Sequence, residues 1–158
     1  MADKLKNIEA DTPEDFLDEA RAAIGQGDAL GVTSFKLVGN WKVKDGKVTA
    51  GDLSVTTEIV RAHWSGATGN NEKALKAIDD WIVQHEQKHV KIANDIVAKA
   101  KKTFEKEIVG KTDAEAQALR DKVQKDIDDA YKDLDSKEGK LTVTRGSSGV
   151  YSLKEGGA

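Results

Sequence analysis

The sequence predicts an α+β fold, in which a small antiparallel sheet is followed by a long antiparallel pair of helices. Residues 30–63 mix apolar and polar side chains in the manner of strands, and Asp45-Gly46 is a strong signal for a two-residue hairpin turn. From residue 72 to residue 109 the apolar side chains recur every three or four positions, which is typical of a helix. A second helical stripe follows closely over 112–139, so the two helices are expected to run antiparallel.

The length of 158 residues fits one domain with a definite order of elements. We expect an N-terminal helix within 1–28, antiparallel strands within 29–64, a helical hairpin over 72–139 and a short β-hairpin over 140–154. Thr12 and Pro13 favour the start of the first helix, and Gly25 favours its end. Thr112 and Glu115 have the spacing of a capping box for the last helix.

The composition excludes several classes of site and partner. Charged residues make up 34% of the chain with a net charge of −3, and the two signs are well mixed, which argues against nucleic acid as the main partner. There is no apolar run of membrane-spanning length. Without cysteine, a transition metal has to be held by His, Asp or Glu. The first residues show no apolar signal core, which fits a cytoplasmic protein or the mature form of a secreted one. The oligomeric state is left open.

Residues 85–89 read His-Glu-Gln-Lys-His, an HExxH motif on the predicted helix. Because residues four apart share a helix face, His85 and His89 can bind one Zn²⁺ ion. Glu86 points slightly aside, where it can act as general base towards a water molecule that attacks a carbonyl. The motif therefore predicts a zinc-dependent hydrolase, most simply a metallopeptidase acting on a peptide or protein substrate.

The position of the two histidines also allows an interpretation in which they have no catalytic role. Both lie on the apolar stripe between Ile82 and Ile92, where two unpaired imidazoles would be costly to bury. A metal ion removes this cost, and we favour it, whereas hydrogen bonds to neighbouring groups are the alternative. The competing hypothesis is a non-catalytic binding or structural module, in which the helical hairpin mediates a protein interaction and any metal is structural.

A catalytic zinc ion usually has three protein ligands, and the third can be sought by geometry. In an antiparallel pair of helices that both rise about 1.5 Å per residue, the acidic stretch 131–138 returns level with the histidines. The apolar stripe of that helix runs through Ile127, Tyr131 and Leu134, and its next position is Glu138. We favour Glu138 as the third ligand. Asp135 and Asp133, at the edges of the stripe, are the next candidates, and an ordinary solvated helix end is the alternative.

Tyr131 and His63 complete the set of candidate side chains. Tyr131 could act in catalysis by donating a hydrogen bond to the developing oxyanion, or it could be a core tyrosine. His63 follows the last strand of the predicted sheet and could be a ligand, a substrate contact or a surface histidine.

The order of these features resembles a known bacterial family, the predicted secreted zinc-dependent proteases, an HExxH zincin-like domain of otherwise unknown function. The resemblance covers roughly residues 30–139 and is carried by the following positions: Trp64, Trp81, His85, Glu86, His89, Val90, Tyr131 and Gly139. It implies a zincin-like fold, zinc as cofactor, protease activity and a secreted or periplasmic location, although no signal peptide is visible here. The family tends to have histidine where this chain has Glu138, and glutamate can also bind zinc.

Overall fold

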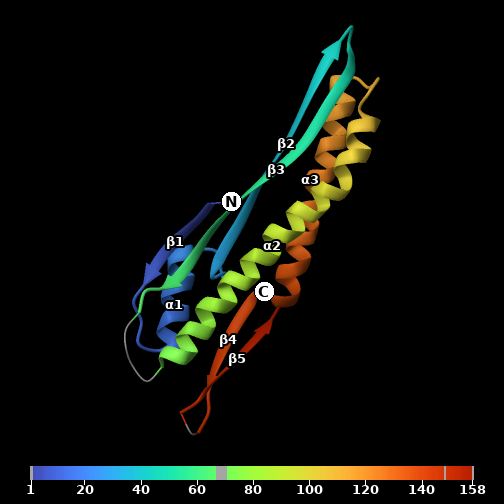
Figure 1. Cartoon of the computed structure of the whole chain (residues 1–158). Helices are drawn as coiled ribbons and strands as arrows, with labels where there is room; N and C mark the ends of the chain where they lie inside the picture. Colours follow the sequence, from blue (N-terminus) through green and yellow to red (C-terminus); the bar gives the residue numbers. More distant parts are fainter. Residues whose placement is uncertain (1, 67–70, 148, 158) are drawn as a thin grey trace. The chain divides into compact units, whose positions relative to one another are not determined.

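The computed structural model describes residues 2–66, 71–147 and 149–157 and confirms the predicted α+β class (Figure 1). The helices are α1 (Pro13–Ile24), α2 (Glu72–Glu107) and α3 (Asp113–Glu138). The strands are β1 (Ala2–Ile8), β2 (Gly31–Lys44), β3 (Lys47–Trp64), β4 (Lys140–Arg145) and β5 (Tyr151–Gly156). Most of the loop predicted between the last long strand and α2 lies outside the described residues.

The larger sheet has the strand order β1-β3-β2. Asp45 and Gly46 join β2 to β3 with φ values of 53° and 74°, as the predicted two-residue turn requires. Strand β1 was not predicted from the sequence, and it pairs with β3 in parallel, from Ala2 opposite Glu58 to Ile8 opposite Trp64. The sheet is therefore mixed, whereas only antiparallel strands had been expected. The side chains from Asp3 to Asn7 are all exposed, so no apolar alternation marks this strand.

The predicted helix ends are confirmed by their capping contacts. The side chain of Thr12 accepts a hydrogen bond from the backbone N–H of Asp15 at 3.2 Å, and Gly25 closes α1 with a φ of 71°. At the start of α3, the backbone N–H of Thr112 donates to Glu115 at 3.1 Å, and the N–H of Glu115 donates to the Thr112 hydroxyl at 3.2 Å. This is the reciprocal pattern of a capping box.

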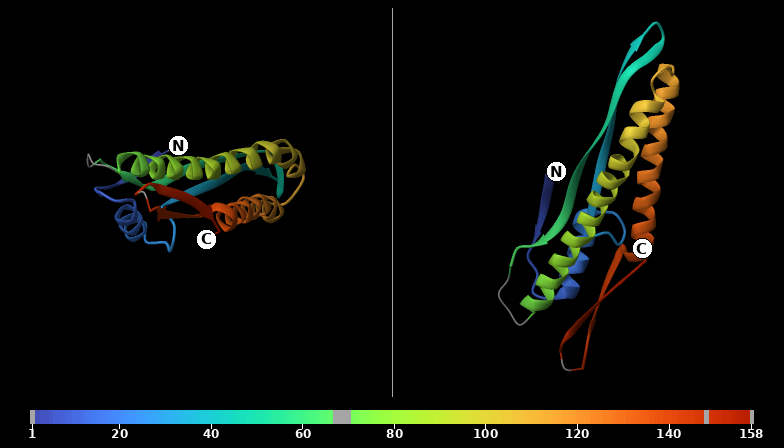
Figure 2. Two further views of the ribbon diagram at one scale, coloured as in Figure 1. Left: turned by 90° about the horizontal axis from the view of Figure 1, so that it is seen from below. Right: turned by 45° about the vertical axis from the view of Figure 1, so that its right-hand side comes forward.

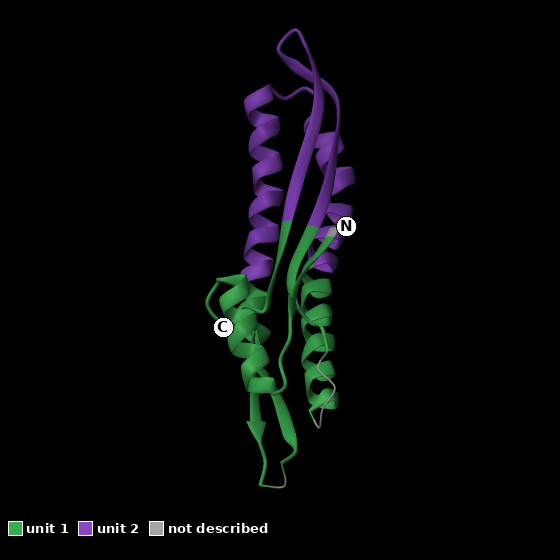
Figure 3. Cartoon of the chain, turned by 90° about the vertical axis from the view of Figure 1, so that its left-hand side faces the viewer, with its two compact units in different colours: residues 1–34, 58–89, 133–158 green, residues 35–57, 90–132 purple. Residues whose placement is uncertain are grey.

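The chain forms two compact units, coloured separately in Figure 3. Unit 1 consists of residues 1–34, 58–89 and 133–158, and unit 2 of residues 35–57 and 90–132. Each unit has its own apolar cluster. The cluster of unit 1 is formed by Ile8, Ala10, Phe16, Leu17, Ala20, Leu30, Ala62, Leu75, Ile78, Ile82 and Leu141. That of unit 2 is formed by Leu37, Val48, Leu53, Ala93, Val97, Phe104, Ile108, Ala116, Val123 and Ile127.

In unit 1, the first half of α2 presents its apolar face to the cluster. Leu75, Ile78 and Ile82 follow helical spacing and are each at most 1% exposed. Continuing this spacing by three and then four residues leads to His85 and His89, so burial of the stripe also buries the motif. The predicted C-terminal hairpin is present as β4 and β5, which follow directly on α3 (Figure 2).

A partly buried polar cluster in unit 1 connects α2 to β3. Asp79 on α2 accepts a hydrogen bond from the backbone N–H of Trp64 at 3.1 Å, and its Oδ1 lies 3.0 Å from Nδ1 of His63. The same oxygen lies 3.6 Å from Nη1 of Arg61, whose side chain is only 10% exposed and also pairs with Asp3. Asp79 therefore compensates a nearly buried guanidinium.

We predict that Asp79→Ala lowers the free energy of unfolding by about 2 kcal/mol or more, because it removes a main partner of the buried Arg61 charge. The neighbouring Asp80→Ala is the matched control. Asp80 forms an exposed pair with Lys76, and its loss is expected to cost no more than about 0.5 kcal/mol. Urea unfolding followed by circular dichroism measures both, and equal effects of the two substitutions would contradict this account of Asp79.

Candidate metal centre

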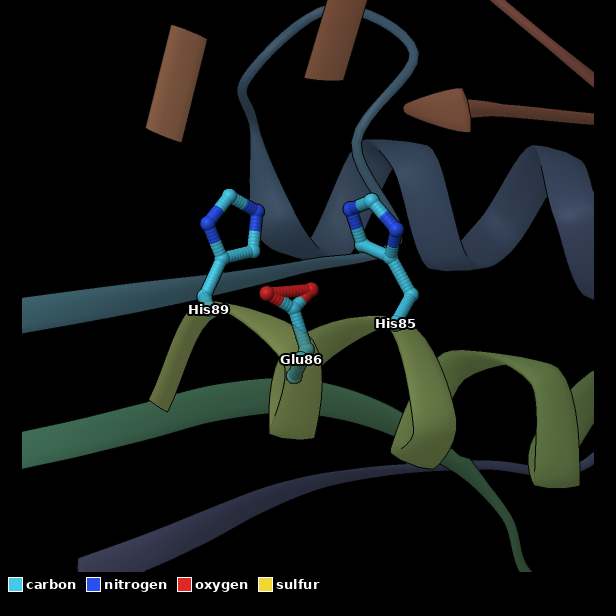
Figure 4. A group of neighbouring side chains, drawn as sticks. All are labelled: His85, Glu86 and His89. Atoms are coloured by element: carbon cyan, nitrogen blue, oxygen red, sulfur yellow. The ribbon is translucent and has the colours of Figure 1, made fainter. Parts of the chain in front are cut away.

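The two histidines of the HExxH motif are buried side by side on α2. His85 is 7% exposed and His89 is 4% exposed, and their ring centroids are 5.0 Å apart. Figure 4 shows the imidazoles rising from successive turns of α2, with the carboxylate of Glu86 between them. One potential ligand atom of each of the three residues lies within 4.8 Å of the others. The predicted convergence of these side chains is therefore present.

A carboxylate from α3 completes this group. Oδ1 of Asp135 lies 3.0 Å from Nε2 of His85 and 2.8 Å from Nε2 of His89, so one oxygen serves both rings. Partial burial by itself raises the pKa of the Asp135 carboxyl. The hydrogen bonds and charges of His85 and His89 outweigh this effect, and the pKa is held well below its usual range. Asp135 is therefore ionised at neutral pH.

Two of the distances between these three side chains come close to those of a zinc site. Tetrahedral zinc with bonds of about 2.0–2.1 Å places neighbouring ligand atoms about 3.3 Å apart. The distances from Asp135 Oδ1 to the two Nε2 atoms, 3.0 and 2.8 Å, are shorter by only about 0.3 to 0.5 Å. Small outward shifts would thus admit an ion. Two imidazoles and a carboxylate also form a donor set that catalytic zinc sites use.

The second ring nitrogen of His85, Nδ1, is buried and has no hydrogen-bond partner in the described part of the chain. A buried polar atom of this kind costs free energy. It is not the atom through which His85 faces Asp135.

The α3 carboxylate that lies beside the histidines is Asp135, and the choice of third ligand among the α3 acids stays a prediction. Glu138, the favoured third ligand from the sequence, pairs instead with Lys88. Asp133 accepts a hydrogen bond from Lys137 one turn along the exposed face of α3. The acidic stretch 131–138 does return beside the histidines of α2, as predicted from the helix geometry. The rotation of α3 about its own axis was not predicted. It directs Asp135, at the edge of the apolar stripe, towards the imidazole rings, rather than Glu138.

Glu86, the predicted general base, is held against the start of β2. It is 2% exposed, and its Oε1 accepts a hydrogen bond from the hydroxyl of Thr33 at 2.9 Å. Burial raises the pKa of the Glu86 carboxyl, while the charges of the two histidines and the Thr33 hydrogen bond oppose the rise. A carboxylate whose pKa lies above the usual range takes up a proton more readily, as a general base has to do.

Trp81 lies one turn before His85 and supports it. The two rings are stacked, with centroids 5.0 Å apart and planes at 8° to each other. Nε1 of Trp81 donates a hydrogen bond of 2.8 Å to Glu155 on β5. The C-terminal hairpin is therefore linked to the site through this ring. The spacing of four residues between Trp81 and His85 was visible in the sequence, but the role of Glu155 was not.

A cavity of roughly 190 Å³ lies beside the group, lined by Gln26, Asp28, Ala29, Leu30, Gly31, Trp81, His85, Glu86, Asp135 and Gly139. A neighbouring cavity of roughly 370 Å³ is lined by Trp81, Gln84, His85, Lys88, Leu141, Leu153 and Glu155. Trp81 and His85 border both. Ligand sites usually measure about 300–1,000 Å³. The first cavity alone is smaller than this, so a substrate larger than a few atoms would also occupy the second.

The remaining candidates lie elsewhere. Tyr131 belongs to unit 2, where its ring packs edge-to-face on Phe35 with centroids 5.3 Å apart. Its role as a hydrogen-bond donor in catalysis stays a prediction. His63 pairs with Asp79 on the first half of α2, as described above, and its sequence position alone could not separate that contact from a ligand role.

Comparison with known proteins identifies a family. Residues 6–141 match the model of a family described as "Bacterial protein of unknown function (DUF922)", and this range includes the HExxH motif and Asp135. No curated protein and no solved structure matches the chain. Among the described residues, no helix has the length and apolar character needed to cross a membrane.

The geometry predicts which acid on α3 matters for metal binding. Asp135→Ala should weaken zinc binding by more than about tenfold, because it removes the only α3 carboxylate that the described structure hydrogen-bonds to both rings. Glu138→Ala is the matched control on the same helix and should change the affinity by less than about threefold. Competition titration with a chelator measures both constants, and the reverse order would restore Glu138 as the third ligand.

Proposed function

Because the chain belongs to the bacterial family DUF922, whose description assigns no activity, we propose its function from the site itself: a zinc-dependent hydrolase of the zincin type, acting as a metallopeptidase. One observation carries the proposal. Two buried imidazoles one helical turn apart converge on a single oxygen of Asp135, with the buried carboxylate of Glu86 between them.

The proposed roles follow from the donor atoms. His85 and His89 through Nε2, together with Asp135 through Oδ1, would hold the metal. When bound, zinc polarises a substrate carbonyl and lowers the pKa of water towards neutrality. Glu86 accepts a proton as water attacks the carbonyl carbon, and it returns that proton to the amide nitrogen as the carbon–nitrogen bond breaks. Burial of Glu86 supports this role, because it moves the pKa of the carboxyl towards the working pH.

The sheet next to the site supports a peptide as substrate. β2 lies at one end of the strand order β1-β3-β2, and its first residues lie beside Glu86. An edge strand can bind an extended peptide by main-chain hydrogen bonds, which would bring an amide bond of the peptide towards the site.

A structural module remains the second candidate, and a specific contact favours it. The oxygen of Asp135 lies within hydrogen-bond distance of both histidines. This contact by itself ties the first half of α2 to the end of α3 within unit 1, which is a sufficient role in a protein that carries out no chemistry.

The substitution Glu86→Gln separates the two candidates, since it keeps the shape of the side chain and removes its basicity. For a hydrolase we expect stoichiometric zinc to be retained and kcat to fall by at least about a hundredfold. Zinc analysis and cleavage of a mixed peptide library, followed by mass spectrometry, provide the measurements.

The control for the metal itself is His85→Ala, which should abolish both zinc binding and hydrolysis. A parent protein that takes up no zinc, or an active Glu86→Gln variant, would overturn the proposed mechanism in favour of the structural module.

A further inference from the structure

We propose that Thr33 and Gly31, at the start of β2, are positioning residues that determine which oxygen of Glu86 receives the proton. Thr33 fixes Oε1 by a hydrogen bond, and Gly31, which has no side chain, leaves space for Oε2. This inference rests on the proposed function, because it assigns the atoms with which Glu86 would act as general base.

Thr33 restrains the carboxylate through its hydroxyl. The side chain is buried, and Oγ1 lies 2.9 Å from Oε1 of Glu86 and 3.3 Å from the backbone oxygen of the same residue. A hydroxyl has a single proton to donate. The shorter distance favours Oε1 as the acceptor of this proton. One lone pair of Oε1 is thereby occupied, and the rotation of the carboxylate is restricted.

Gly31 lies against the other oxygen. A Cβ atom built on this glycine would lie 2.9 Å from Oε2 of Glu86 and 3.1 Å from its Cγ. It would also lie 3.1 Å from Cβ of Arg61, so a methyl group has nowhere to go unless Glu86 moves. The glycine is needed here for close approach rather than for a left-handed backbone conformation.

The surroundings indicate that Oε2 is the oxygen available for chemistry. Gly31 and Glu86 both line the cavity that also contains His85 and Asp135. Thr33 engages Oε1, so this hydrogen bond leaves Oε2, the oxygen that lies against Gly31, for the proton. A general base requires one free oxygen at a fixed position, and small displacements of such a group reduce rates strongly.

The central variant is Thr33→Val, which keeps the shape of the side chain and removes the hydroxyl. We expect zinc stoichiometry to be unchanged, KM to stay within about threefold and kcat to fall about ten- to a hundredfold. Thr33→Ser retains the hydroxyl and should restore kcat to within about threefold of the parent. Thr142→Val, which removes an exposed hydroxyl from β4, is the matched control and should behave as the parent does.

Gly31→Ala tests the other half of the proposal. The added methyl group should displace the Glu86 carboxylate and lower kcat to a similar extent, with zinc still bound. A readout independent of activity is the crystal structure of metal-free Thr33→Val, in which the Glu86 carboxylate should be rotated or adopt more than one rotamer. A purely structural role of Thr33 would affect stability without this pattern.

The outcomes separate the two levels of inference. If the parent is active and Glu86→Gln is not, while Thr33→Val keeps the parental kcat and an unmoved Glu86, positioning by Thr33 is refuted and the proposed function stands. If the parent neither binds zinc nor cleaves peptides, both fall together. Should Thr33→Val fail to fold, Thr33→Ser and Thr33→Ala differ in the hydroxyl alone, and equal kcat values for that pair refute the proposal.

Discussion

The candidate site depends on one contact, the oxygen of Asp135 that lies within hydrogen-bond distance of Nε2 in both His85 and His89. Two imidazoles buried among apolar side chains are unfavourable unless both find a partner. A single carboxylate supplies that partner, and it comes from the end of α3 in the same compact unit. Everything else at the site is arranged around this contact: Trp81 is stacked on one ring, Glu86 lies between the two rings, and a small cavity borders them.

The same stretch of α2 therefore serves the packing of unit 1 and carries the candidate site. Leu75, Ile78 and Ile82 anchor the helix in the core of unit 1, and the helical repeat carries that inward direction on to the histidines. The start of β2 lies against Glu86, so the sheet sets the position of the base while the helix pair sets the positions of the possible ligands. A metal site needs such support from its surroundings, because the ligands alone do not determine their own orientation.

What could be predicted from the sequence was local. The hairpin turn at Asp45-Gly46, the capping contacts of Thr12 and Thr112, and the common face of His85 and His89 all depend on residues within four positions of each other. Strand β1 is different, because its pairing with β3 links residues more than fifty positions apart and its exposed side chains show no pattern. The choice of Asp135 over Glu138 depends on how α3 is rotated, which packing decides and helical periodicity does not.

The charges around the cavity bear on whether the contact of Asp135 is sufficient by itself. The lining contains the acids Asp28, Glu86 and Asp135, and His85 is its only side chain that can become cationic among the described residues. Asp28 is compensated by Lys140, at a distance of 3.7 Å. Glu86 has the Thr33 hydroxyl beside it, and Asp135 has the two imidazoles. Burial raises the pKa of Glu86 most, and the two carboxyl groups are close enough for the charge of Asp135 to raise it further. A divalent cation between these groups would compensate both carboxyl groups, so the charge balance supports the proposed metal site as the distances do.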